Sequence, residues 1–205
     1  MFLPSPRGLA SADLQAERRA MLETESSAQP LRRYLDALRT RRPSHHIPEF
    51  DPADAGSTAR VLLLFTSPTS GSDDRSEGSG FVSVDNDDDT SENLWNLREE
   101  ADLGEHVLTW NVVPWHHEGE TPTTLDQRQG AGELRRLLPL LPNLVTVVLG
   151  GTIARNAWTS LVEPFVPIRD LTVIPSWQTA PKAVNLTGKR NTVLAAFTRA
   201  RHIVR

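Results

Sequence analysis

The chain has 205 residues, with 22 Lys and Arg against 26 Asp and Glu, and it contains no cysteine. Its length suits one domain, or one domain with an extension. Without cysteine the chain cannot form disulfides, thiolate zinc sites, iron–sulfur clusters or a cysteine nucleophile. It shows neither a run of twenty apolar residues nor the basic and apolar segments of a signal peptide. We expect a cytoplasmic monomer that does not contact membranes.

Charge is distributed unevenly along the chain. Acidic side chains crowd residues 73–105, where only Arg75 and Arg98 oppose them. From Lys182 to the C-terminus the chain carries six Lys and Arg and no acid. A basic segment of this kind is either a solvated final helix or a contact for nucleic-acid phosphates.

Residues 1–58 alternate helical patterns with chain breakers. Ser11 and Asp13 can begin one helix, and residues 31–41 place Leu31, Tyr34 and Leu38 on one face of a second. Prolines then interrupt the pattern. We interpret this region as a helical N-terminal extension and linker.

Residues 59–205 alternate short apolar runs with helical patterns. The runs at 61–65, 107–113, 144–149 and 171–174 predict four buried strands, and helices are expected at 92–101, 125–141, 153–162 and 190–203. The long polar stretch 69–90 predicts a loop. This alternation predicts a three-layer α/β/α domain with a central, mostly parallel four-stranded sheet.

In open α/β sheets the ligand site lies beyond the carboxyl ends of the strands. Gly150 and Gly151 follow one expected strand, but they lack the Lys of a P-loop and the third Gly of a dinucleotide fingerprint. The pairs His45–His46 and His116–His117 are adjacent rather than four residues apart, and no carboxylate motif accompanies them. We expect no metal and no cofactor.

Four segments, in this order, carry a family resemblance. They are residues 65–69, residues 79–81 leading to 93–95, residues 109–115, and residues 148–150 followed by a helix, a strand and Pro175–Ser176. Over residues 61–201 the chain resembles the uracil-DNA glycosylase superfamily. Since the chain has no cysteine, it differs from the branches that bind an iron–sulfur cluster. The resemblance implies a DNA glycosylase that flips uracil or another altered base and hydrolyses its N-glycosidic bond.

The resemblance also assigns roles to residues. Phe81 is expected to stack on the base and Asn111 to hydrogen-bond its edge, while Trp115 or His116 borders the space that the base leaves. Phosphate contacts are expected from Ser176, Thr179, Lys182, Lys189 and Arg190.

The chain departs from the family at its catalytic motifs. The first motif usually carries Asp, Asn or Glu before its Pro, where this chain has Thr66 and Ser67. The histidine of the late motif is absent, and in one register Gln178 replaces it. Thr66, Ser67 and Gln178 can orient water but are poor bases.

Three explanations stay open. In the first, Asp85 or Asp87, in the loop after Phe81, moves into the pocket and supplies a carboxylate. In the second, the enzyme relies on positioning and on a base that leaves easily. In the third, the protein binds an altered base without cutting it. The long loop would also accommodate a bulky modified pyrimidine of foreign DNA. A different class of protein, an enzyme that binds free nucleosides or nucleotides, would use the same strand-end pocket.

Overall fold

A computed structural model describes residues 2–117, 121–166 and 170–205. Its centre is a parallel sheet with the strand order β4-β2-β5-β6. The strands are β2 (Val61–Phe65), β4 (Val107–Asn111), β5 (Thr146–Gly150) and β6 (Thr172–Ser176). The α-helices are α1 (Ala12–Thr24), α2 (Gln29–Arg41), α3 (Asp89–Glu100), α4 (Thr124–Leu137), α5 (Thr152–Ala157), α6 (Pro181–Val184) and α7 (Lys189–Val204).

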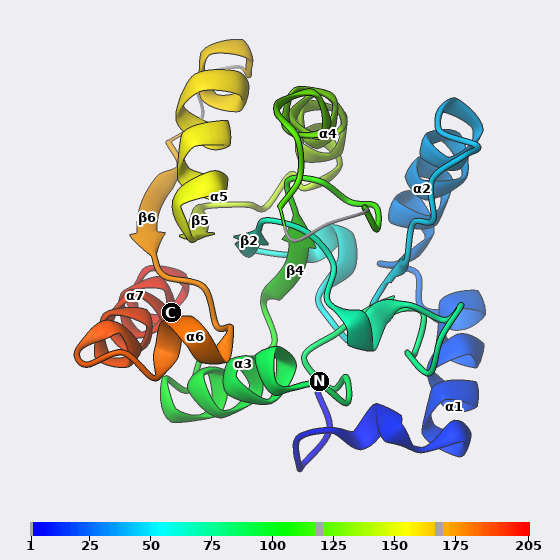
Figure 1. Cartoon of the computed structure of the whole chain (residues 1–205), viewed down its shortest axis with the longest axis horizontal. Coiled ribbons are helices and arrows are strands. Elements are labelled where there is room, and N and C mark those ends of the chain that lie inside the picture. The colour runs from blue at the N-terminus through cyan, green and yellow to red at the C-terminus, as the bar shows by residue number, and fades with distance from the viewer. Residues whose placement is uncertain (1, 118–120, 167–169) are drawn as a thin grey trace.

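Helices cover both faces of the sheet, with α4 and α5 on one side and α3 and α7 on the other (Figure 1). Alternate residues of β2 separate the two cores, because successive side chains of a strand point to opposite faces. Leu62 and Leu64 join the core under α4 and α5, whereas Val61 and Leu63 join the core under α3 and α7. The three-layer α/β/α fold expected from the sequence is confirmed.

The N-terminal helices lie beside the β4 edge of the sheet (Figure 1). Leu35 and Leu38 of α2 are fully buried in the same hydrophobic cluster as Trp110 of β4. Phe50 stacks on Trp110 with ring centroids 3.6 Å apart. The region before residue 59 therefore shares a core with the sheet.

Some element boundaries differ from the expected ones. Helix α3 begins at Asp89, because Asp88 caps it by accepting hydrogen bonds from the backbone N–H groups of Thr90 and Ser91, each at 2.9 Å. The helix therefore begins three residues before the expected start at Glu92. Strand β6 continues through Pro175, which is tolerated because β6 is an edge strand.

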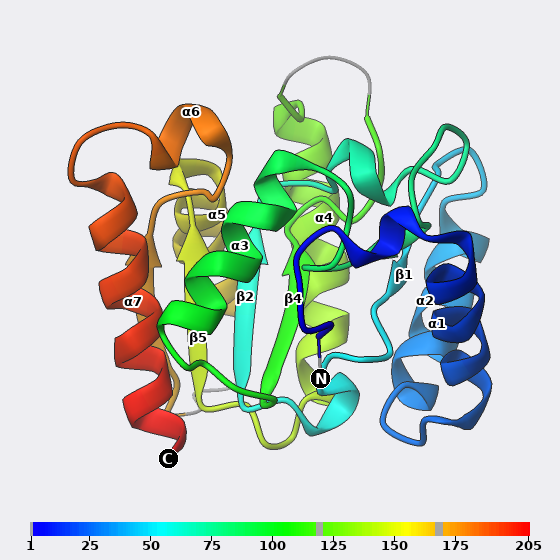
Figure 2. The ribbon, with the colours of Figure 1, turned by 90° about the horizontal axis from the view of Figure 1, so that it is seen from below.

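The stretch 69–90, expected to be a loop, contains one short strand. There β3 (Phe81–Val82) pairs in parallel with β1 (Glu49–Phe50), and strands of two residues leave no readable pattern in a sequence. Loops after the sheet strands gather at one edge, together with α6 (Figure 2). No helix within the described part of the chain is long and apolar enough to cross a membrane.

Candidate active site

A cavity of about 360 Å³ opens at the carboxyl edge of the sheet, between the strand ends and the start of α3. This volume falls within the range of small-molecule sites. The wall includes residues 65–69, 82–83 and 178–180, together with Thr109, Asn111, Ser91 and Ile153. The cavity therefore lies where open α/β sheets place their ligands.

Phe65 and Asn111 are register partners at the ends of β2 and β4. Thr109 lies two residues before Asn111, so both side chains share one face of the sheet. The ring of Phe65 extends over Gly150, where an added Cβ would lie 2.4 Å from two of its carbons. Phe65 is the only aromatic residue in the described part of the wall. It offers a flat apolar surface beside two polar groups.

Three wall residues carry buried polar atoms that make no hydrogen bond in the described structure. These atoms are Thr66 Oγ1, Thr109 Oγ1 and Asn111 Nδ2. An unsatisfied buried polar group costs about 1–3 kcal/mol. Because all three belong to one wall, the cavity suits a polar guest that can pair with them.

Ser67, another wall residue, is paired with a histidine. Nε2 of His117 lies 3.2 Å from Ser67 Oγ, within hydrogen-bond distance. An imidazole bonded to a hydroxyl can orient a water molecule and take its proton. Sequence reasoning missed His117, although its place in the loop after β4, six residues beyond Asn111, was a usable signal.

The loop after β6 completes the wall. The Gln178 side chain packs over Gly151, where an added Cβ would lie 2.6 Å from Gln178 Cγ. Asn93 Nδ2 of α3 donates to the Thr179 carbonyl at 3.0 Å and ties this loop to the helix. Of the residues expected from the sequence, the structure thus brings together Thr66, Ser67, Asn111, Gln178 and Thr179.

Comparison with known families agrees with this geometry. The model of the uracil DNA glycosylase superfamily matches residues 53–200, well over half of the chain. The chain belongs to the uracil DNA glycosylase superfamily. The resemblance read from the sequence motifs is confirmed. No curated protein matches this glycosylase-superfamily member closely enough to be named as a relative.

The described side chains of the cavity wall are uncharged. Within residues 2–117, 121–166 and 170–205, none of the wall residues carries an ionisable side chain. His117 is not a residue of the described wall but contacts Ser67, which is. Any activation of water in this site has to come from hydroxyl, amide or imidazole groups, because the described wall offers no carboxylate.

The position of Phe81 contradicts its expected stacking role. Its side chain is 1% exposed and packs with Leu9 and Leu22 in a small separate core. Val82 and Ser83, the next residues along the chain, line the cavity instead. The Phe81 ring therefore lies outside the described cavity wall, in which Phe65 is the aromatic residue.

Asp85 is also held away from the cavity, contrary to the expectation that it supplies a carboxylate. Its buried side chain accepts hydrogen bonds from Arg18 at 2.7 Å and from the Leu3 backbone N–H at 3.1 Å. Arg18 is shared with a second buried acid, Asp51. Burial raises the pKa of Asp85 to about 6, and Asp51 adds to this, whereas Arg18 opposes it. The carboxyl group is a structural anchor for the N-terminal segment.

Trp115 and His116 lie behind the wall and do not border the described cavity. Trp115 is fully buried and donates from Nε1 to Asp126 at 3.3 Å. His116 stacks on His46 with ring centroids 5.3 Å apart. Neither residue belongs to the described wall, although Thr121 and Pro122, later in the chain after β4, do.

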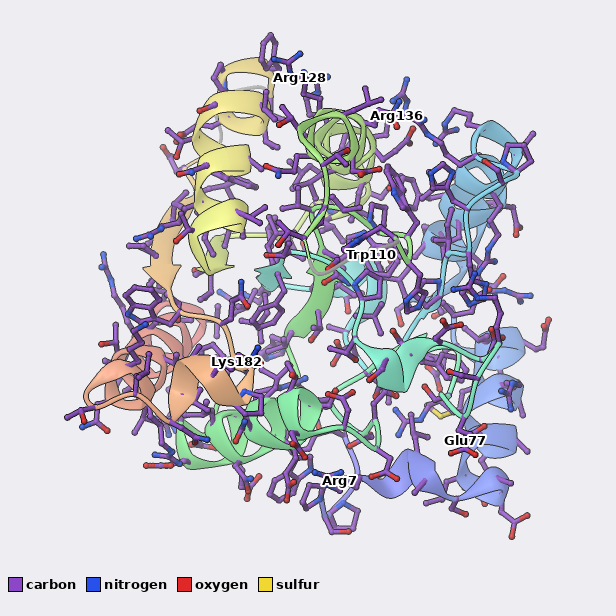
Figure 3. The ribbon with its side chains drawn as sticks, viewed as in Figure 1. Arg7, Glu77, Trp110, Arg128, Arg136 and Lys182 are labelled. Atoms are coloured by element: carbon purple, nitrogen blue, oxygen red, sulfur yellow. The ribbon has the colours of Figure 1, made fainter. Side chains whose placement is uncertain are left out.

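The expected phosphate contacts divide into two groups. Ser176 is 5% exposed at the end of β6, and its buried Oγ makes no hydrogen bond within the described structure. Lys182 is exposed on α6 (Figure 3). Lys189 places Nζ 4.0 Å from the centroid of Trp177, and Arg190 pairs with Glu100 at 2.5 Å. Lys182 and Arg190 are exposed, and Lys189 is half-buried.

Proposed function

We propose that this chain is a DNA glycosylase that receives an extrahelical base in the cavity and hydrolyses its N-glycosidic bond. The observation that carries the proposal is the wall of the cavity, where Asn111 and two threonines keep unpaired polar atoms beside the ring of Phe65. A flipped base needs a stacking surface and partners for its polar edge. The family membership supports the same class of reaction.

Base binding in this proposal combines stacking with edge recognition. The Phe65 ring stacks on the base, a contact that tolerates any base because each has a π-face. The Asn111 amide and the hydroxyls of Thr66 and Thr109 pair with its polar atoms. Asn111 discriminates most strongly, because its amide presents a donor and an acceptor in one plane.

The reaction requires that C1′ lose the base and gain water. When the C1′–N bond breaks, its electron pair goes to the departing base, and the Asn111 Nδ2–H group stabilises the negative charge. Water held by Ser67 attacks C1′, and its proton passes through the Ser67 hydroxyl to Nε2 of His117. The wall has no carboxylate among its described residues to balance a sugar cation. The site therefore favours a base that leaves easily.

The substrate we propose is uracil or another altered pyrimidine, including a bulky one. The cavity of about 360 Å³ equals roughly a dozen water molecules at about 30 Å³ each. Such a volume leaves room beside a pyrimidine ring for a substituent. The biological setting would be base excision, either in DNA repair or against modified foreign DNA, by a cytoplasmic monomer.

The decisive experiment incubates the purified chain with DNA panels that contain uracil, hypoxanthine, hydroxymethylcytosine or glucosylated cytosine. Alkaline cleavage then scores abasic sites. We expect product from at least one panel and a loss of about 100- to 1,000-fold in Asn111→Ala, the size seen when one oxyanion-type donor is removed. Ser67→Ala should lose less. The opposite ranking would mean that the base binds elsewhere.

The neutral wall also favours a second candidate, a protein that recognises an altered base in DNA without cutting it. Tight, base-dependent binding with no abasic product from any panel would establish this reading. A third reading, binding of free nucleosides, differs in its salt dependence. Affinity for DNA falls steeply with rising salt because counterions are released, whereas affinity for a neutral nucleoside does not.

A further inference from the structure

A second group of reactive side chains lies behind the cavity wall. His46, Asp73 and His116 each place one potential ligand atom within 4.8 Å of the others. They come from three separate segments: the stretch after α2, the loop after β2 and the loop after β4. The His116 backbone N–H donates to the His46 carbonyl at 2.9 Å, so the two histidine segments are joined directly.

The geometry of this cluster fits one small cation. Nε2 of His46 lies 3.4 Å from Asp73 Oδ1. Two ligands about 2.0–2.2 Å from a tetrahedral ion are separated by roughly 3.4 Å. A fourth group is close by, because Asp74 Oδ1 lies 2.9 Å from the same Nε2 atom. The imidazole rings of His46 and His116 are stacked, with centroids 5.3 Å apart and an interplanar angle of 25°.

We propose that His46, Asp73 and His116 bind a divalent transition-metal ion. Two imidazoles and a carboxylate are a donor set that such ions prefer. Nε2 of His46 is buried and faces carboxylate oxygens of Asp73 and Asp74 at 3.4 and 2.9 Å, so this nitrogen and both acids lie close enough to share one ion.

Arg75 is the group that competes with an ion. Its guanidinium holds Asp73 through hydrogen bonds of 2.9 and 2.8 Å. The Arg75 side chain is 57% exposed, and ion pairs of this kind add little stability because water screens them. Arg75 can therefore swing into solvent and leave an ionised carboxylate for the metal.

The ion would act on the shape of the cavity and not on the reacting atoms. Ser72 belongs to the cavity wall, and its Oγ lies 3.5 Å from His116 Nε2. A metal held by the neighbouring Asp73 would fasten this wall loop to the N-terminal segment that carries His46. The adjacent histidine pairs concealed the site in the sequence, because its two imidazoles come from different pairs.

The test uses the full chain, stripped with a chelator, and Zn²⁺ alone as the probe. Calorimetric titration should give one bound ion per chain, and Zn²⁺ should raise the thermal unfolding midpoint, as any ligand specific for the folded state does. His46→Gln and His116→Gln should each weaken binding at least tenfold. His202→Gln, an exposed histidine on α7, is the matched control and should bind as the wild type does.

Co²⁺ provides an independent readout, because its visible absorption reports nitrogen and oxygen ligands. Asp73→Asn, which preserves size, should lose this spectrum while circular dichroism shows that it is folded. The proposal is overturned if Zn²⁺ gives no one-to-one binding, or if both histidine variants bind as tightly as the His202→Gln control. These measurements need no DNA, so they stand or fall separately from the glycosylase activity.

Discussion

The ring of Phe65 occupies the space that a side chain at position 150 would fill. An added Cβ on Gly150 would lie 2.4 Å from two ring carbons, far inside van der Waals contact. The glycine at the end of β5 therefore lets the last residue of β2 lie flat against the cavity. In the proposed function this ring is the stacking surface, a role that the family resemblance assigned to Phe81.

Phe65→Leu should lower kcat/KM by roughly 5- to 150-fold, since base stacking on an aromatic side chain contributes about 1–3 kcal/mol. Excision assays under single-turnover conditions measure this loss. Phe81→Leu is the matched control, because its ring is buried away from the cavity. It should lower the free energy of unfolding by about 1–2 kcal/mol and leave the excision rate of folded protein unchanged. Equal activity losses in the two variants would return the stacking role to Phe81.

Ser67 and His117 should behave as one unit in catalysis. We expect Ser67→Ala to lower kcat about tenfold and His117→Gln about 100-fold, because positioned general bases contribute at least that much. The double variant should be no slower than His117→Gln alone, since both changes interrupt the same proton path. A double-mutant cycle on the excision rate measures the coupling. Multiplicative losses would show that the two side chains act independently.

The contact between DNA and α6 should depend on salt. Lys182→Ala should weaken binding and reduce the slope of log K against log salt by about 1, the value for one lost phosphate contact. Fluorescence anisotropy with a labelled duplex at several salt concentrations gives the slope. Arg136→Ala is the control, because Arg136 lies in the last turn of α4, far from Lys182 (Figure 3). Identical slopes for both variants and the wild type would show that Lys182 of α6 does not contact DNA phosphate.

Asp85 should make part of the stability depend on pH. Its folded pKa of about 6 lies above the value near 3.9 of an unfolded aspartate. The folded state therefore holds a proton that the unfolded chain has released, and the associated stability is lost as pH rises from about 4 to 6. The loss amounts to roughly 3 kcal/mol at about 1.4 kcal/mol per pKa unit.

Urea unfolding of the wild type and Asp85→Asn at pH 4.5 and pH 7 checks this. The variant lacks the titrating group. The difference in free energy of unfolding, variant minus wild type, should therefore become more positive as pH rises. A difference between the two proteins that does not change with pH would contradict the assignment.

The sequence by itself determined the layers, the strands and part of the site. Apolar runs and helical spacing are local patterns, so strands such as Val61–Phe65 could be read directly. The cavity also follows, because parallel strands bring their carboxyl ends to one edge, and Asn111 ends such a strand. Thr109 had a usable signal too, as a polar residue in an otherwise apolar strand.

The tertiary structure decided which side chains face the cavity. The pairing of β3 with β1 turns Phe81 into a small core and exposes Val82 and Ser83 to the wall. Arg18 binds Asp85, which lies 67 residues away in the sequence. A buried carboxylate needs a hydrogen-bonded or charged partner, and the fold places Arg18 beside it. His46 and His116 are also brought together by packing between segments that are distant in the sequence. Contacts between distant segments leave no local pattern, so only the fold could reveal them.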